Sequence, residues 1–151
     1  IRRFADEGLQ VKLAISLHAA TDAERDRLLP VNKRWPLADL LDAVRYYIDR
    51  TGRRVTFEWA LIAGENDTME QATGLGKLLH GLMCHVNLIP LNPTDGYSGR
   101  PSDPGRVEAF QGVLKSYGVS STVRVRRGID IQAGCGQLKS EVTRKRSGRD
   151  T

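Results

Sequence analysis

Cysteine, long apolar runs and the common nucleotide-binding motifs are scarce or absent in this sequence. Two cysteines, Cys84 and Cys135, are too few for a disulfide scaffold and too far apart for a paired-cysteine zinc site. No apolar run approaches the roughly 18 residues of a membrane span, and no secretory signal opens the chain. A dinucleotide-binding glycine fingerprint, a P-loop, a zinc-protease motif and the serine-hydrolase elbow are also missing. These absences favour a cytoplasmic protein with no membrane partner.

The length and composition are those of one compact domain. The chain has 151 residues, of which 40% are hydrophobic and 27% charged. A chain of this size buries roughly 68–70% of its unfolded surface. The opening residues, Ile1 to Ala5, are typical of the middle of a longer polypeptide chain. We therefore expect a longer protein, whose N-terminal portion would be a partner of this chain.

Positive charge is concentrated near the C-terminal end. The net charge of the chain is +5. Between residues 120 and 149, two acidic residues stand against eight basic ones: Arg124, Arg126, Arg127, Lys139, Arg144, Lys145, Arg146 and Arg149. Such an excess is typical of a polyanion-binding surface, with RNA or DNA favoured over lipid. We assign residues 1–142 to the domain and 143–151 to a basic tail, for which a disordered segment that binds nothing is an equally good interpretation.

Four strand-like runs alternate with helical patterns. Apolar and β-branched residues concentrate at 11–17, 54–62, 85–89 and 119–126. Capping residues, apolar periodicity and terminal glycines predict four helices. The first follows Thr21, the second lies between Pro36 and Gly52, the third runs from Thr68 through Leu82 and the fourth from Asp103 to Gly118. Gly74 and Gly76 weaken the third of these helices. The alternation predicts an α/β fold, a parallel sheet with helices on its outer face.

In parallel α/β sheets, ligands bind beyond the C-terminal ends of the strands. We therefore expect the chemistry at 16–19, 63–67, 90–93 and 126–135. Cys135 stands between two glycines, which allow a ligand close to the sulfur, and upstream arginines would favour its thiolate. On spacing alone, a nucleophilic role and an inert loop thiol are evenly balanced.

The other candidate residues have both functional and structural interpretations. Cys84 borders an apolar strand and is best interpreted as a small buried hydrophobe. His18 could contact a ligand or be a satisfied histidine at a strand end. Asn92, between Leu91 and Pro93, could recognise a ligand, although a turn-forming asparagine is favoured. Arg124 and Arg126 share one face of the last strand, where they would line a polar cavity or a solvated edge. The stretch 64–67 contains a helix cap and is assigned no chemistry.

Three sequence elements resemble one enzyme family in their order and spacing. They are Ala14-Ile15-Ser16-Leu17-His18-Ala19, Asn87-Leu88-Ile89-Pro90-Leu91-Asn92-Pro93 and Arg127-Gly128-Ile129-Asp130-Ile131-Gln132-Ala133-Gly134-Cys135-Gly136-Gln137-Leu138. They are similar to elements of the radical S-adenosylmethionine (SAM) methyltransferases that act on adenine C2 of large-subunit ribosomal RNA and, in some members, of transfer RNA. The similarity extends from about Val11 to Val142. The related adenine-C8 methyltransferases share these elements.

The resemblance implies a fold, cofactors and roles for individual residues. The fold would be a partial (β/α) barrel to which this chain contributes the later strands, and this chain would be its C-terminal half. Ser16, Leu17, His18 and Asn92 match positions that bind SAM, and Cys135 matches the cysteine that carries the methyl group. In the family, a radical generated at a 4Fe–4S cluster activates that methyl group, and a second cysteine releases the product by forming a disulfide. Independently of the resemblance, the concentration of positive charge makes Arg124, Arg126 and Arg127 candidate RNA contacts.

One departure from the family pattern limits what this chain can do. The family holds its iron–sulfur cluster through a Cys-x-x-x-Cys-x-x-Cys loop, and no such loop occurs here. Two distant cysteines cannot replace it, and Cys84 does not match the second, product-releasing cysteine. We therefore expect this chain to contribute no metal ligands and to be inactive alone, as part of a protein that is active. The alternatives are a non-catalytic RNA-binding homologue and an unrelated barrel enzyme with a catalytic Cys135.

Overall fold

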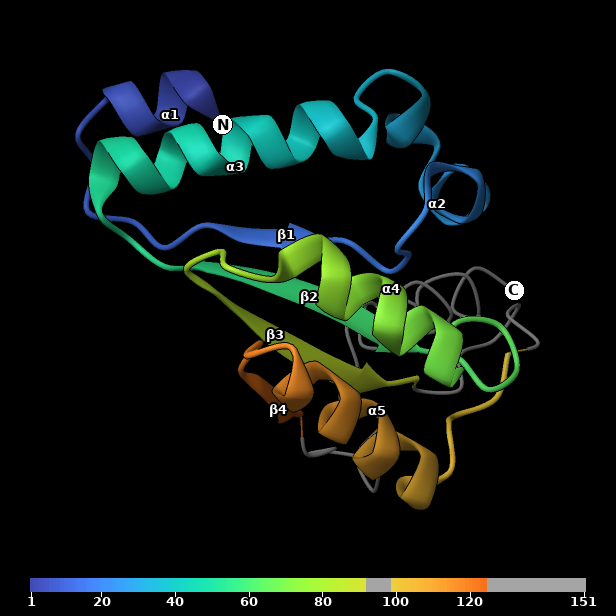
Figure 1. Ribbon diagram of the computed structural model, residues 1–151. Coiled ribbons are helices and arrows are strands. Elements are labelled where there is room, and N and C mark those ends of the chain that lie inside the picture. Colours follow the sequence, from blue (N-terminus) through green and yellow to red (C-terminus); the bar gives the residue numbers. More distant parts are fainter. Residues whose placement is uncertain (92–98, 125–151) are drawn as a thin grey trace, which may run out of the picture.

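A computed structural model describes residues 1–91 and 99–124 of the chain (Figure 1). Four residues singled out from the sequence, Asn92, Arg126, Arg127 and Cys135, lie outside the described residues, as does the tail 143–151. Ser16, Leu17, His18 and Arg124 lie within them.

The sheet has four strands, all parallel, in the order β1-β2-β3-β4. Their bounds are β1 Ala14–Ser16, β2 Val55–Leu61, β3 Cys84–Pro90 and β4 Ser121–Val123. Each pair of neighbours in the sheet is also a pair of neighbours in sequence, joined by a helical connection, which confirms the predicted α/β fold. The central strands match their predicted ranges closely. Strand β1 is shorter than predicted, because Val11 and Lys12 are exposed and pair with no strand.

The helices begin and end largely where the capping residues predict. Thr21 caps α2 (Asp22–Leu28), and Pro30 opens a short 3-10 helix, η1 (Pro30–Lys33). Helix α3 (Leu37–Thr51) ends at Gly52, whose φ of 64° is the left-handed conformation that glycine adopts without strain. Thr68 caps α4 (Met69–Leu79), and Asp103 caps α5 (Pro104–Ser116). A short helix, α1 (Arg2–Asp6), packs against α3 and was not predicted.

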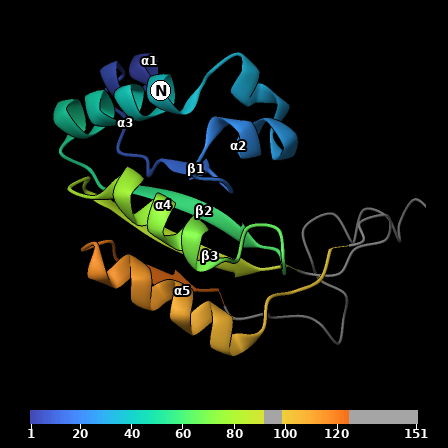
Figure 2. The same ribbon diagram turned by 45° about the vertical axis from the view of Figure 1, so that its right-hand side comes forward.

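Helices α3, α4 and α5 cover one face of the sheet (Figures 1 and 2). Along β2 the burial alternates, so that Val55, Phe57, Trp59 and Leu61 are fully buried. These side chains join one apolar core with residues of all three helices, and the rings of Trp59 and Phe110 lie 5.8 Å apart. Burying one such aromatic side chain contributes on the order of 1.5–3 kcal/mol.

The core also accounts for two features that the sequence left open. Cys84 is buried at the start of β3, and burial raises the pKa of its thiol to about 11, which confirms its interpretation as a small hydrophobe. Gly76 of α4 lies directly against Tyr117, and a Cβ there would overlap the aromatic ring. Helix α4 therefore forms despite its glycines because close packing on Tyr117 requires one of them. In the parts of the chain that are described, no helix has the length and apolarity to cross a membrane.

Candidate functional site

The face of the sheet opposite α3, α4 and α5 is polar, and it is called the helix-free face because no helix among residues 1–91 and 99–124 covers it. Parallel sheets are usually apolar and covered on both faces, so this face is unusual. The strand register aligns one row across all four strands, Ser16, Glu58, Asn87 and Thr122. All four side chains are exposed or half-buried, whereas the residues on either side of them are buried in β1, β2 and β3 and half-buried in β4.

Hydrogen bonds link much of this row. The amide of Asn87 donates to Glu58 Oε1 at 3.0 Å, and the hydroxyl of Thr122 lies 2.9 Å from Asn87 Oδ1. His85, one row earlier, lies 3.0 Å from the same hydroxyl through Nε2. One consistent proton assignment has His85 donating to Thr122, Thr122 to Asn87 and Asn87 to Glu58. The Glu58 carboxylate is then the final acceptor of a polar chain.

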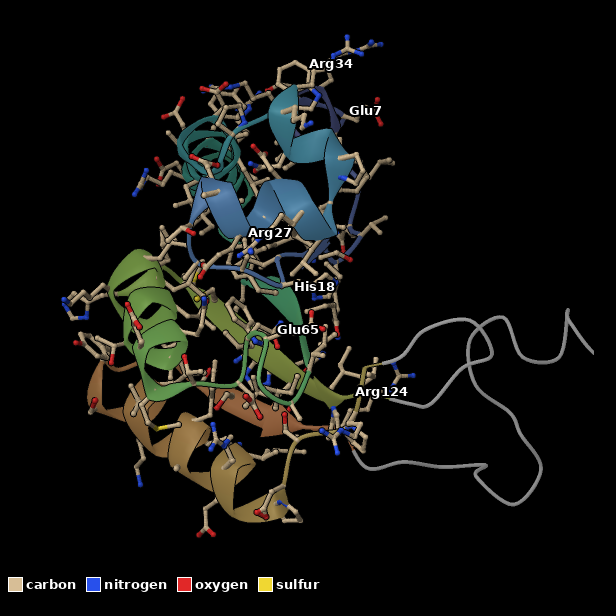
Figure 3. All side chains as sticks on the ribbon, turned by 90° about the vertical axis from the view of Figure 1, so that its right-hand side faces the viewer. Glu7, His18, Arg27, Arg34, Glu65 and Arg124 are labelled. Carbon is tan, nitrogen blue, oxygen red and sulfur yellow. The ribbon has the colours of Figure 1, made fainter. Side chains whose placement is uncertain are left out.

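The C-terminal ends of the strands form a common rim, where Figure 3 shows His18, Glu65 and Arg124 on the same side of the molecule. Strand β1 ends just before His18, β2 before the loop that carries Glu65, and β4 just before Arg124. Arg124 is exposed, and its backbone N–H donates to Leu88 of β3 at 2.8 Å. The structure thus brings together the predicted segments 16–19 and 63–67 with Arg124.

The three residues that follow one another at the end of β1 point in alternating directions. Ser16 is exposed on the helix-free face, whereas the side chain of Leu17 is completely buried. The backbone N–H of Leu17 donates to Glu58, and its carbonyl accepts from Arg25. Ser16 and His18 are therefore the residues of this segment whose side chains are available to a ligand on the helix-free face.

His18 has an unusual backbone conformation and a defined tautomer. Its φ is 61°, and among the described residues it is the one non-glycine residue with positive φ, a conformation often found at functional sites. Nδ1 accepts a hydrogen bond from the N–H of Ala60 at 2.9 Å, so the proton of the neutral ring is on Nε2. Burial, with the nearby charge of Arg25, lowers the pKa of His18. At neutral pH the ring is uncharged and offers an N–H donor.

Asn66 is a site residue that the sequence did not reveal. It is 3% exposed, and its amide nitrogen donates to the carbonyls of His18 at 2.9 Å and Ala60 at 2.7 Å. Its Oδ1 accepts from the N–H of Ile62 at 2.8 Å. From the sequence, 63–67 was expected at the ligand-binding edge, but 64–67 was assigned only a helix cap and no chemistry. In the structure Thr68 caps α4 and Asn66 joins the ends of β1 and β2.

Arg25 is a second site residue that the sequence did not reveal. It is 4% exposed, although arginine is almost never fully buried without partners. Its guanidinium donates to the carbonyls of Leu17 and Ser16 and to Asn32 Oδ1. In the sequence Arg25 lies in a short, strongly charged helix, and only its distant partners distinguish it from the exposed Arg27 nearby.

The residues present fit SAM better than they fit an iron–sulfur cluster. Among the described residues, no group of three or more His, Cys, Asp or Glu side chains could hold a metal ion. The whole sequence has two cysteines, and cluster binding requires several thiolates together. The Ser16 hydroxyl, the His18 Nε2–H and the Glu58 carboxylate supply donors and acceptors suited to a polar nucleoside such as SAM. The cluster does not fit the residues of this chain.

Comparison with known proteins finds relatives along nearly the whole chain. It is 61% identical over 145 residues to dual-specificity RNA methyltransferase RlmN 1 of Myxococcus xanthus, and this alignment covers 96% of the chain. It is 52% identical over 143 residues to the probable dual-specificity RNA methyltransferase RlmN of Halalkalibacterium halodurans. The chain spans about 40% of the length of these relatives. No model of a protein family matches the chain.

Solved structures agree with the sequence comparison. A radical SAM methyltransferase from Sphaerobacter thermophilus superposes with a TM-score of 0.87 at 50% identity, covering 90% of this chain and 40% of that one. A domain of a pyruvate-formate lyase-activating enzyme from Bacteroides vulgatus superposes with a TM-score of 0.64 at 15% identity, which concerns the fold alone. It covers 83% of this chain. These likenesses confirm the partial radical-SAM α/β fold, and over the part of their length that it spans, the chain is similar to proteins named as dual-specificity RNA methyltransferases and to a radical SAM methyltransferase.

Proposed function

We propose that the protein containing this chain methylates C2 of an adenine in large-subunit ribosomal RNA and in transfer RNA. The observation that carries the proposal is the 61% identity, over nearly the whole chain, to a protein named as a dual-specificity RNA methyltransferase. The polar, helix-free face that ends in Ser16 and His18 supports it, because such a face in a parallel sheet suits a ligand.

We propose that SAM binds at this rim, in contact with Ser16, Leu17, His18 and Asn92. When bound, SAM supplies the methyl group and the radical precursor that such a reaction needs. The Ser16 hydroxyl and the neutral His18 ring orient the ligand through hydrogen bonds, and the fixed tautomer of His18 ensures that Nε2 is a donor. Because the side chain of Leu17 is buried, Leu17 would contact the ligand through its backbone.

Cys135 is proposed as the covalent carrier of the methyl group. C2 of adenine is not nucleophilic, so a polar methyl transfer from a sulfonium fails there. A methyl group tethered to a protein sulfur is held next to the ring, and this tethering lowers the entropic cost of the encounter. Cys84 cannot take this role, because it is buried and the raised pKa keeps its thiol protonated at neutral pH.

RNA is the proposed partner, with Arg124 at the rim as one phosphate contact and Arg126 and Arg127 as further ones. An arginine next to the site where a base must enter would bind the phosphate backbone and contribute to a salt-dependent affinity. The 4Fe–4S cluster is assigned to the remainder of the protein, since its ligands do not occur in this sequence. We place the protein in the cytoplasm, where its RNA substrates are made.

The proposal is tested with the full-length protein, reconstituted anaerobically with iron, sulfide and SAM and given ribosomal or transfer RNA. Digestion of the RNA and mass spectrometry should reveal 2-methyladenosine. Cys135→Ala should abolish this product, and Cys84→Ala should retain it as the matched control. An 8-methyladenosine product would show that the protein is instead one of the adenine-C8 methyltransferases. Undiminished product from Cys135→Ala would contradict the role of Cys135, and RNA binding without any product would favour a non-catalytic homologue.

A further inference from the structure

Buried side chains hold three consecutive backbone carbonyls at the end of β1. Arg25 Nη2 donates to the carbonyl of Ser16 at 3.1 Å, and Arg25 Nε donates to that of Leu17 at 3.2 Å. Asn66 Nδ2 donates to the carbonyl of His18 at 2.9 Å. Both side chains come from later in the sequence, Arg25 from α2 and Asn66 from the loop after β2. Every carbonyl of the segment proposed to bind SAM is thus fixed by a side chain that is itself almost completely buried.

Arg25 is part of a polar cluster that links α2, η1 and α3 to the rim. Its Nη1 donates to Asn32 Oδ1 at 2.6 Å, and Asn32 Nδ2 donates to Asp22 Oδ1 at 3.0 Å and Asp26 Oδ1 at 2.7 Å. Asp22 also accepts from the N–H of Leu37, the first residue of α3. A buried guanidinium is costly unless it is paired and hydrogen-bonded, and an apolar residue would stabilise a purely structural contact at least as well. What the arginine adds is the geometry of its fork, which fixes two carbonyls relative to each other.

Every hydrogen-bonding group of the Asn66 side-chain amide has a backbone partner. Both hydrogens of Nδ2 have acceptors, the carbonyls of His18 and Ala60, and Oδ1 accepts from the N–H of Ile62. An aspartate lacks the donors and a serine lacks the reach, so this set of contacts requires asparagine. Because one of the acceptors belongs to His18, the amide also stabilises the left-handed backbone of that residue, with its φ of 61°.

We propose that Arg25 and Asn66 are positioning residues that hold the backbone of Ser16, Leu17 and His18 in the conformation that binds SAM. Neither needs to touch the ligand, because both are buried beneath the rim. They hold the backbone that carries the Ser16 hydroxyl and the His18 Nε2–H at the C-terminal end of β1, where Figure 3 shows His18. This inference rests on the proposed function, since it concerns the same SAM site.

The test uses reconstituted full-length protein and two substitutions that preserve size. Arg25→Lys keeps a positive charge but cannot donate to both carbonyls and to Asn32. Asn66→Asp keeps the acceptor for Ile62 and loses the donors to His18 and Ala60. Equilibrium dialysis against SAM should show its dissociation constant raised about 10–100-fold in both variants, the range typical when groups that orient ligands are removed. The KM for SAM should rise similarly, whereas kcat at saturating SAM and the affinity for RNA should change little.

Two matched variants separate positioning from general stability. Arg27→Lys alters an exposed residue of the same helix, labelled in Figure 3. Asp67→Ala alters a 1% exposed neighbour of Asn66 whose Oδ1 accepts from Gly64 and pairs with Arg106, with no recorded contact to β1. Both should bind SAM like the parent protein, although Asp67→Ala should unfold at a lower temperature.

The possible results lead to different conclusions. Parent-like SAM binding by folded Arg25→Lys or Asn66→Asp would overturn the positioning role of the residue concerned. Equal weakening by Asp67→Ala and Asn66→Asp would show that loop stability alone matters, and would overturn the role of Asn66. If Asn66→Asp does not fold, Arg25→Lys decides on the carbonyls of Ser16 and Leu17, and Asn66→Ser, read in the same assay, decides on that of His18. Failure of the parent protein to bind SAM would instead refute the proposed function, and the positioning roles with it.

Discussion

The two faces of the sheet differ in what their residues are selected to do. On the helix-covered face, Phe57 and Trp59 are completely buried in an apolar core. On the other face, Glu58 sits between them in sequence but belongs to a half-exposed polar row. One strand can thus carry the apolar core on one face and a polar row on the other, because successive side chains point to opposite faces. Substitutions one residue apart should therefore have quite different consequences.

The largest expected effect comes from the paired substitutions Phe57→Ala and Glu58→Ala. Removing the Phe57 ring leaves a cavity in the core and should lower the free energy of unfolding by about 3–5 kcal/mol. Glu58→Ala removes the hydrogen-bond acceptor of the half-exposed Asn87 amide and should lower the free energy of unfolding by about 0.5–1.5 kcal/mol. Urea unfolding of the two variants measures both values. Similar losses in the free energy of unfolding for the two variants would contradict this difference between the two faces.

A medium effect is expected from the paired helix substitutions Gly76→Ala and Gly112→Ala. A Cβ at Gly76 would overlap the Tyr117 ring, and overpacking of this kind costs about 1–3 kcal/mol. Gly112 of α5 has nothing within 4 Å of such a Cβ, so alanine there should stabilise the helix by up to about 1 kcal/mol. In thermal unfolding, Gly76→Ala should melt below the parent protein and Gly112→Ala above it. A stabilised Gly76→Ala would mean that α4 does not pack on Tyr117 as the structure shows.

The smallest expected effect is the pH dependence that His18 imparts from the polar face. Burial lowers its pKa in the folded protein, so between that value and the unfolded pKa near 6.5 the unfolded chain binds more protons. Stability should therefore be lost as pH falls from 7 through the lowered pKa. His18→Asn removes the titrating group and tolerates a positive φ, so melting temperatures of this variant should depend less steeply on pH. His85, whose pKa burial also lowers, accounts for part of the slope that remains. An unchanged slope would contradict a buried, neutral His18.

Local patterns in the sequence predicted the elements of the fold but not the contacts between them. The caps at Thr21, Thr68 and Asp103 and the apolar periodicity of α3 act over a few residues, so they can be recognised in the sequence directly. Strand β1 was predicted too long, because a run of apolar residues does not reveal which of them find a neighbouring strand.

The candidate site could be predicted only in part, for the same physical reason. The segment containing Ser16 and His18 was found from its motif, and its rim position followed from the parallel sheet. The left-handed backbone of His18 depends on Asn66, which lies 48 residues away. Arg25 has the same chemical identity as Arg27, and only the fold distinguishes the buried guanidinium from the exposed one. Such long-range hydrogen bonds leave no periodic signal in a single sequence.

We propose that the polar face and its rim belong to a methyl-transfer site completed by Cys135. The most direct measurement is peptide mass spectrometry of the full-length protein after reconstitution and incubation with SAM. We expect the peptide containing Cys135 to gain the mass of one methyl group in place of hydrogen, and the peptide containing Cys84 to stay unmodified. A Cys135 peptide that remains unmodified in protein that is actively methylating RNA would contradict it.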